Sequence, residues 1–341
     1  MASMRIGTKT IGAGAGTLMF AEEGQANQGD IGTAVDMCEV AARAGADGIE
    51  FQLFLADDMY VRDDPGYATY RDRELSKTQI SELIAAAHDQ GLLCQVAGLS
   101  PKIIEFCAEA GADTFCVNAT DLTNPLIIDS VAGTGRPFWL ATLMGTIPEI
   151  DWAVDYATSR TSSSVGLLHG QHVMSSAAGN GVPPELLQLD CIGLLQHRYG
   201  LVTGFVDHTA TGFVPALAAV KGAALVMKHL APTSEWTGPD WQVCLGPESW
   251  SKAKQMLDYA IQAGGSSKEI SQAESKDRSR HRRSIYTTVA LTAGDTISEG
   301  DLTALRPGLG GEDPRIIHEL VGRQVACDLD AQHQLHFDDL V

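Results

Sequence analysis

Short apolar runs alternate with longer amphipathic stretches along this chain from about residue 17 onward. Eight of the apolar runs have the length of buried strands, and each precedes a segment with helical periodicity. The predicted strands cover residues 17–22, 48–52, 92–97, 114–117, 138–142, 165–169, 202–206 and 224–229. This alternation is typical of successive βα units, so we expect an α/β fold with a parallel sheet.

A short repeat marks the ends of two predicted helices. Residues 42–47 and 108–113 have the sequences ARAGAD and AEAGAD, and each leads directly into a predicted strand. Glycine closes a helix there because it adopts the left-handed conformation easily. An open doubly wound sheet would carry a glycine-rich loop after its first strand, whereas the GAGAG sequence at 12–16 precedes that strand. We therefore predict a closed (β/α)8 barrel and a flexible N-terminal loop.

The composition changes near residue 264, where GGSS is followed by a charged run. This change predicts a barrel domain over 1–265, a linker over 266–283 and a small strand-rich domain over 284–341. Domains of about 60 residues bury little surface, so we expect the catalytic pocket in the barrel.

Charge and composition narrow the possible partners. The formal net charge is -19, which disfavours binding to nucleic acid and to anionic membranes, and the basic run at 276–283 is interpreted as a solvated linker. No apolar run approaches the ~20 residues of a membrane span. The seven cysteines are scattered without paired spacing, so we interpret them as small buried residues in a reducing compartment. We expect a cytoplasmic protein.

Polar side chains end most of the predicted strands. In a barrel of this type the active site is built from the carboxyl ends of the strands. The candidates, all at or just beyond such ends, are Glu22, Glu50, Gln52, Asp121, Thr142, His169, Asp207, His208, Lys228 and His229.

His169 and His208 end neighbouring predicted strands. Two imidazoles there can converge on one cation, and carboxylate or water can complete an octahedral shell suited to Mn²⁺ or Mg²⁺. Asp207 can orient a metal-binding residue by a hydrogen bond without binding the cation itself. Each histidine taken alone is explained equally well as a hydrogen-bonded structural residue, but the pair favours metal binding. We interpret His172 and His197 as surface histidines.

Three further charged residues have two interpretations each. Glu22 and Asp121 are candidates for acid–base chemistry or for binding sugar hydroxyls, because an enclosed carboxyl group can be tuned towards neutral pH. Alternatively each forms a helix cap or a loop salt bridge, and Asp121 could cap a helix that begins near Thr123. Lys228 either neutralises an anionic substrate, which we favour, or forms an ion pair in the barrel base.

The same residues lie in sequence words whose order and spacing resemble the sialic acid synthase family. The matching words are FAEEG (20–24), GADGIEFQ (45–52), TNPL (123–126), LLH (167–169), DHT (207–209), KH (228–229), GPD (238–240) and RRS (282–284). AGDTI (293–297) and LRPG (305–308) resemble the antifreeze-like (SAF) domain that follows the barrel in this family. The similarity therefore extends over nearly the whole chain.

This resemblance implies a set of roles. His169 and His208 correspond to metal-binding histidines, Glu22 to a sugar-binding glutamate and Asp121 to a glutamate proposed for acid–base work. It also implies a domain-swapped homodimer in which Arg306 reaches the sugar in the partner's barrel. Family members condense phosphoenolpyruvate with an open-chain N-acylated hexosamine, and a divalent metal polarises the aldehyde.

The chain departs from the family where the phosphate is bound. Glu50 and Cys116 occupy lysine positions, and Ala97, Ala119 and Ala141 occupy positions of serine or threonine. These changes remove the positive charge and the hydroxyl donors that a phosphate group requires. We therefore expect either a donor other than phosphoenolpyruvate or a rebuilt phosphate site.

Three functions remain open. We favour a synthase or aldolase, a transferase or lyase of carbohydrate biosynthesis that makes or breaks a C–C bond at a sugar carbonyl, with Gln52, Thr142, Asp207 and Lys228 contacting the substrate. The second is a metal-dependent sugar epimerase or isomerase in which Glu50 joins the two predicted metal histidines. The third is a catalytically silent sugar-binding protein.

Overall fold

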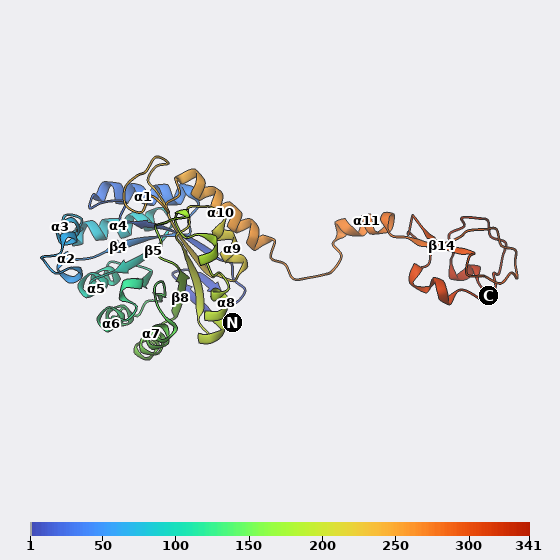
Figure 1. Ribbon diagram of the computed structural model, residues 1–341, viewed down its shortest axis with the longest axis horizontal. Helices are drawn as coiled ribbons and strands as arrows, with labels where there is room; N and C mark the ends of the chain where they lie inside the picture. The colour runs from blue at the N-terminus through green and yellow to red at the C-terminus, as the bar shows by residue number, and fades with distance from the viewer. Residues whose placement is uncertain (1) are drawn as a thin grey trace. The chain divides into compact units, whose positions relative to one another are not determined.

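The structure, a computed structural model, describes residues 2–341. Its internal contacts divide the chain into two compact units, one ending at Gly265 and the other spanning Ser266–Val341 (Figure 1). Each unit has a hydrophobic core of its own.

The first unit is a closed barrel of eight parallel strands. In chain order and barrel order these are β3 (Leu18–Gly24), β4 (Gly48–Leu53), β5 (Leu93–Gly98), β6 (Thr114–Val117), β7 (Phe138–Ala141), β8 (Val165–Gly170), β11 (Val202–Asp207) and β12 (Leu225–His229), and β12 pairs with β3. The predicted fold class is confirmed. The ends of the predicted strands agree with these bounds within two residues.

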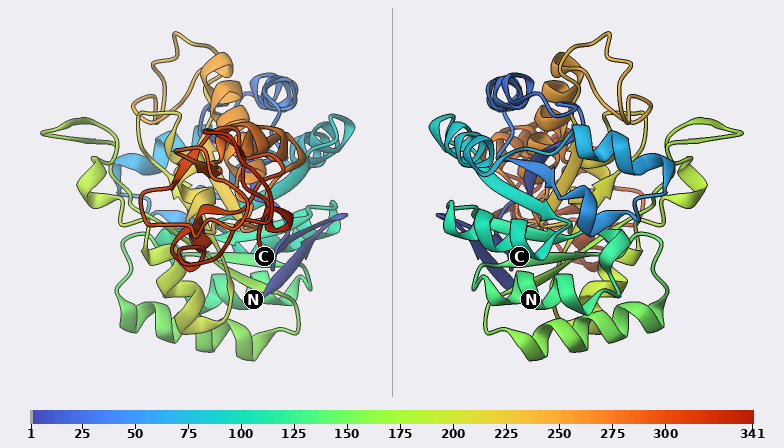
Figure 2. Two further views of the ribbon diagram at one scale, coloured as in Figure 1. Left: turned by 90° about the vertical axis from the view of Figure 1, so that its right-hand side faces the viewer. Right: turned by 90° about the vertical axis from the view of Figure 1, so that its left-hand side faces the viewer.

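Helices surround the barrel (Figure 2). They are α1 (Ile31–Ala44), α4 (Lys77–Asp89), α5 (Pro101–Glu109), α6 (Pro125–Gly133), α7 (Ile147–Arg160), α8 (Cys191–Tyr199), α9 (Val214–Val220) and α10 (Pro247–Gln262), with the shorter α2 (Ala56–Met59) and α3 (Pro65–Asp72) after β4. Gly45 ends α1 with φ 89°, and Gly111 follows α5 with φ 103°. The left-handed role predicted for the repeated glycines is confirmed.

A β-hairpin at the N-terminus closes the amino end of the barrel. Strand β1 (Ser3–Ile6) pairs antiparallel with β2 (Lys9–Gly12). Met4, Ile6 and Ile11 are fully buried and pack with residues that line the barrel interior, among them Leu18 and Val202 at the starts of β3 and β11. Sequence analysis missed this hairpin because each strand has only four residues. The GAGAG sequence forms the connection from the hairpin to β3.

The second unit contains α11 (Gln272–His281), β13 (Ser284–Thr287) and β14 (Leu302–Leu305), with short 3-10 turns η3 (Pro314–Glu319) and η4 (Phe337–Asp339). The two strands pair antiparallel over a small core that includes Ile285, Leu302 and Leu335. Helix α11 lies within the segment that the sequence predicted to be a linker. Among the described residues, no helix has the length and apolar character that a membrane span needs.

The cysteines differ in their exposure. Cys38, Cys94, Cys107 and Cys116 are buried free thiols, as the sequence predicted, but Cys327 is exposed. Cys191 and Cys244 are half-buried. The prediction that all seven are buried is therefore wrong, because composition and spacing carry no information on which face of a turn a single residue occupies.

The hairpin's contribution to stability can be measured. Ile11→Ala removes a fully buried side chain at the barrel base, so we expect the free energy of unfolding to fall by about 2–5 kcal/mol. Thr10→Ala, on the exposed face of the same strand, should change it by less than about 0.5 kcal/mol. Urea denaturation of both variants tests this, and equally small losses would contradict a role in closing the barrel.

Candidate functional site

Four adjacent strands carry one layer of buried polar side chains. The strand register pairs His229 of β12 with Glu22 of β3, Glu22 with Glu50 of β4, and Glu50 with Gln95 of β5. Side chains alternate along a strand, and these four lie on the face of Phe20 and Met227, which line the barrel interior. The layer therefore lies inside the barrel, towards its carboxyl end.

Glu22, His208 and His229 form a compact group in this layer. One oxygen or nitrogen atom from each lies within 4.8 Å of the others, and of the described residues these three alone form such a group of possible metal ligands. His229 Nε2 is 3.4 Å from Glu22 Oε1, and the ring centres of His208 and His229 are 5.3 Å apart. All three side chains are buried.

The protonation states of the two histidines favour binding of a cation. Burial lowers the pKa of His208 to about 4 and that of His229 to about 4. Both imidazoles are therefore neutral near pH 7, the form that binds a metal. His208 Nδ1 lies 2.8 Å from the carbonyl oxygen of Gln171, and a proton donated there leaves Nε2 free.

The group fits a divalent cation better than it fits a closed hydrogen-bond network. Glu22 Oε2 and His229 Nδ1 are buried and have no hydrogen-bond partner among residues 2–341. Buried polar atoms in native proteins are normally paired, so unpaired ones indicate a missing ligand. Two imidazoles and one carboxylate are a donor set suited to Mn²⁺ and related metals.

Glu50 occupies a different environment. Its Oε2 accepts a hydrogen bond of 2.5 Å from Gln95 Nε2, which also lies 3.4 Å from Met227 Sδ. Burial, and secondly the charge of Glu22, raise the pKa of Glu50 well above its usual value. Cys116 and Ala141 line the same interior. The positions expected to bind phosphate are thus apolar, apart from the Glu50 carboxyl group, whose pKa is raised.

His169 lies on the other face of its strand. Leu167, two residues earlier on the same face of β8, packs in the core between the barrel and the helices. The ring centres of His169 and of Phe205, which belongs to that core, are 5.9 Å apart. Its Nε2 lies 3.1 Å from the carbonyl oxygen of Gln188 and 3.3 Å from that of Leu187. The structure therefore brings His208 together with His229 and Glu22, and not with the predicted His169.

Asp207 and Lys228 also face outward from the barrel. Lys228 Nζ lies 3.3 Å from Asp207 Oδ2 and donates to the carbonyl oxygen of Thr209. Both side chains of the ion pair are fully buried. Lys228 thus forms an ion pair, which was the alternative interpretation of this residue. The favoured interpretation, that Lys228 neutralises an anionic substrate, loses its support.

The other predicted residues have different positions. Gln52 Nε2 lies 3.4 Å from Glu22 Oε1 and so borders the group. Thr142 donates its hydroxyl to the carbonyl oxygen of Leu168. Asp121 is half-buried and accepts a bond of 2.7 Å from Asn124; Asn124, not Asp121, caps α6. Burial raises the pKa of Asp121. Arg306 is exposed on the second unit, and its predicted contact with a barrel stays a prediction.

Gly24 leaves room for the His229 ring and the Asp240 carboxylate, which both lie close to it. A Cβ on Gly24 would lie 3.2 Å from the His229 ring and 3.5 Å from the Asp240 carboxylate. Asp240 itself has φ 57°, in the left-handed region, which aspartate adopts more readily than most residues other than glycine. Sequence analysis did not single out Asp240, and no local pattern in the sequence indicates its conformation.

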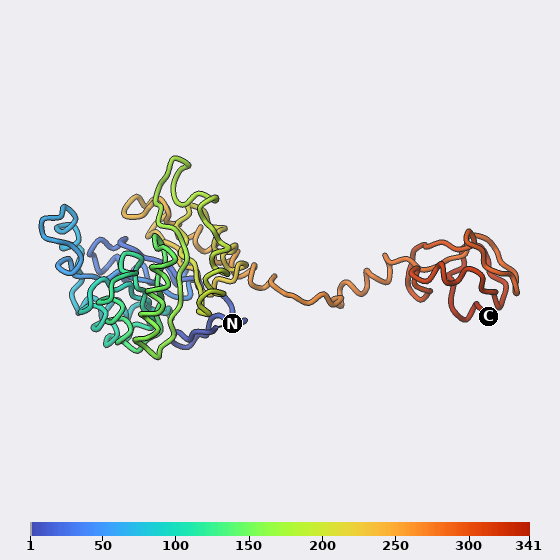
Figure 3. Tube along the Cα trace, turned by 60° about the horizontal axis from the view of Figure 1, so that its bottom comes forward, coloured from blue at the N-terminus to red at the C-terminus, as the bar shows by residue number. Residues whose placement is uncertain are grey.

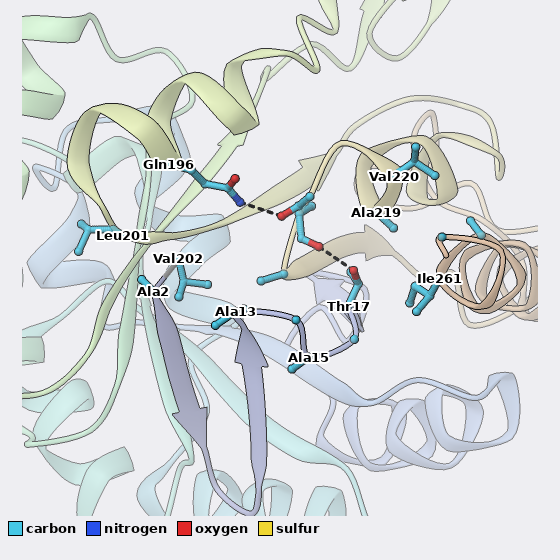
Figure 4. A pocket seen from close by; sticks show the side chains of 18 of the residues that line it. Ala2, Ala13, Ala15, Thr17, Gln196, Leu201, Val202, Ala219, Val220 and Ile261 are labelled. Carbon is cyan, nitrogen blue, oxygen red and sulfur yellow. Dashed lines mark hydrogen bonds between the residues drawn. The ribbon is translucent and has the colours of Figure 1, made fainter. Parts of the chain in front are cut away.

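A further cleft lies away from this group, among residues at the amino end of the barrel. A cleft of about 670 Å³ at the amino end is lined mainly by glycines and small apolar residues. Its polar side chains are engaged, because Thr17 donates to the carbonyl of Ala223 at 2.7 Å and Gln196 to that of Gly222 at 2.8 Å (Figure 4). No titratable side chain lines it, so it offers no acid–base chemistry.

The architecture places this chain in the class of (β/α)8 barrels whose polar cluster lies at the carboxyl ends of the strands. The NeuB family model matches residues 37–269, and the SAF domain model matches residues 282–341. The chain therefore belongs to the NeuB family and carries a C-terminal SAF domain. The resemblance to the sialic acid synthase family is confirmed.

Relatives extend over nearly the full chain at low identity. The spore coat polysaccharide biosynthesis protein SpsE of Bacillus subtilis is 27% identical, covering 100% of this chain and 98% of that protein. The N,N'-diacetyllegionaminic acid synthase of Legionella pneumophila is 26% identical, covering 95% of both. The crystal structure of an N-acetylneuraminic acid synthetase from Leptospira borgpetersenii has a TM-score of 0.74 and 21% identity, covering 81% of this chain and 95% of that one. That structural likeness supports the fold.

The buried ion pair gives a test of the barrel wall. Lys228→Met leaves the Asp207 charge buried without its partner, so we expect a loss of about 3–5 kcal/mol in the free energy of unfolding. Lys221→Met breaks an exposed pair with Asp190 and should cost less than about 1 kcal/mol. Chemical denaturation compares the two. If both variants lose the same free energy of unfolding, the ion pair with Asp207 does not stabilise the barrel, and Lys228 is available to bind a substrate.

Proposed function

We propose that this protein is a metal-dependent enzyme of sugar-acid biosynthesis that forms or cleaves a C–C bond at a sugar carbonyl. The observation that carries the proposal is the buried group of Glu22, His208 and His229 at the carboxyl end of the barrel. Membership of the NeuB family supports it, as do relatives named for legionaminic and pseudaminic acid synthesis.

In this proposal Glu22, His208 and His229 hold a divalent cation, with Mn²⁺ favoured over Mg²⁺ because imidazole is a poor ligand for Mg²⁺. The cation, when bound, polarises the carbonyl of the acceptor sugar. Gln52 orients the Glu22 carboxylate through their contact of 3.4 Å. Glu50 is held by Gln95, and burial raises its pKa; in its protonated form it can donate a hydrogen bond to an oxygen on which negative charge develops.

The donor in this proposal is a 2-keto acid without phosphate, such as pyruvate. Within residues 2–341, Lys228 is the buried cation, and Asp207 already pairs with it. The interior around Glu50, Cys116 and Ala141 offers a phosphate group neither positive charge nor a free hydroxyl. In the reaction the methyl carbon of the keto acid loses a proton and bonds to the aldehyde carbon. The aldehyde oxygen gains a proton, so the balance needs no other reactant.

The metal and the donor can be tested together. We expect bound Mn²⁺ in the purified protein, loss of activity on chelation, and at least about 100-fold lower activity in Glu22→Gln and His229→Ala. Metal content should fall in His208→Ala and persist in His169→Ala. Elemental analysis measures the metal, and mass spectrometry detects the product formed from pyruvate and N-acetylated hexosamines.

Other outcomes would redirect the proposal. Phosphate release from phosphoenolpyruvate with a hexosamine, and no product from pyruvate, would contradict the assigned donor. Full metal retention in His208→Ala with His229→Ala would contradict the site. Retained sugar binding without any product would favour the catalytically silent protein. The epimerase hypothesis loses support, because it needs Glu50 as a metal ligand and the Glu50 carboxyl group instead accepts a hydrogen bond from Gln95.

We also propose a domain-swapped homodimer in which Arg306 completes the site in the partner's barrel, as the family resemblance implies. Arg306→Ala and Glu22→Gln should then each be inactive, whereas each mixed dimer of the two variants has one of its two sites intact. An equimolar mixture in which about half of the dimers are mixed should therefore regain up to about a quarter of wild-type activity. Subunit exchange followed by an activity assay measures this. No recovery, in a mixture shown to contain mixed dimers, would place Arg306 in its own subunit's site or outside any site.

A further inference from the structure

We propose that His172 is a fourth ligand of the cation in the Glu22, His208 and His229 group, an inference that rests on the proposed function. His172 lies just beyond β8 and is exposed. Its ring lies edge-on to that of His208, with ring centres 5.4 Å apart and an angle of 70° between the planes. The sequence alone predicts a surface histidine at this position.

The ring spacing fits a shared ion. Each coordinating imidazole nitrogen lies about 2 Å from its metal, so two rings bound to one ion have centres roughly 5 Å apart. The His208 to His229 separation is 5.3 Å and the His172 to His208 separation is 5.4 Å. His208 is thus flanked by two imidazoles at the spacing of common ligands. His172 is not among the three residues whose ligand atoms lie within 4.8 Å of one another, so its exposed side chain has to turn towards them when the ion binds.

The loop that carries His172 is fastened to the segment carrying His208. The carbonyl oxygen of Gln171 accepts the bond from His208 Nδ1, and the N–H of Val182 donates to the His208 carbonyl at 2.9 Å. Gly181 has φ 72° and bridges to Thr209; a Cβ on Gly181 would lie 2.6 Å from the His208 carbonyl oxygen. Both ends of loop 171–182 are therefore held at His208, which keeps His172 beside the group.

The tip of this loop is free of the barrel. It forms a two-residue hairpin, β9 (Ser175–Ser176) with β10 (Gly179–Asn180), whose residues are exposed. The segment between β8 and α8 projects beyond the neighbouring loops (Figure 3). A ligand on such a loop can bind or leave the ion without disturbing the buried three. The resulting set has three imidazoles and one carboxylate.

This set limits what the substrate can contribute. Four protein ligands leave two positions of an octahedral shell, which suits the two adjacent oxygens of a 2-keto acid or of a hydroxy-aldehyde. With one carboxylate as the only anionic ligand, the centre retains a net positive charge that attracts such oxygens. His172 would thereby select a bidentate substrate.

Cu²⁺ is the probe for the number of histidine ligands, because electron paramagnetic resonance resolves nitrogen couplings. In a buffer that does not coordinate metals, with Cu²⁺ displaceable by excess Mn²⁺, we expect three imidazole nitrogens in the wild type and two in His172→Ala. His197→Ala, which removes an exposed histidine on α8, should keep three. The Kd for Mn²⁺ should rise by about tenfold or more in His172→Ala. Removing a residue that only supports a metal ligand already weakens metal binding by about that factor.

Each result decides between the two proposals. Two imidazole nitrogens in both wild type and His172→Ala, with an unchanged Kd, would overturn the role of His172 and leave the three-residue centre intact. Absence of Cu²⁺ and Mn²⁺ binding in the wild type would overturn the metal centre and this inference with it. His172 is exposed, so unfolding curves that match the wild type will show that the variant is folded.

Discussion

The parallel register of β12, β3, β4 and β5 is the constraint on which the site depends. It places His229, Glu22, Glu50 and Gln95 at one level inside a barrel that excludes water. Burial then determines the chemistry, because it favours neutral imidazoles and raises the pKa of Glu50. A shift of one residue in any of these strands would turn its polar side chain towards the helices. The closed barrel prevents such a shift, and the N-terminal hairpin fills its base.

The fold could be predicted from the sequence because its signals are local. The eight apolar runs, and the glycines Gly45 and Gly111 that follow two of the helices, can each be recognised within a short stretch of sequence. The hairpin over residues 3–12 could not be predicted in the same way. Its strands are too short for periodicity, and the apolar side chains find their partners on strands far along the chain.

The site was predictable in part, and the differences between prediction and structure have a physical cause. Collecting every polar residue at the end of an apolar run ignores the alternation of side chains, so His169 and Lys228 were assigned to the site although both side chains lie on the outer faces of their strands. Alternation applied to β12 would have assigned His229 to the face of Met227, inside the barrel. The role suggested for His172 depends on the path of loop 171–182, which no sequence period specifies.

The central claim is that Glu22, His208 and His229 bind the cation. The most direct measurement is X-ray diffraction from crystals grown with Mn²⁺, with data collected at the manganese absorption edge. The account predicts one strong anomalous peak per barrel, about 2 Å from the Glu22 carboxylate and from one nitrogen of each of His208 and His229. A peak bound by His169, or no peak inside the barrel, would contradict it.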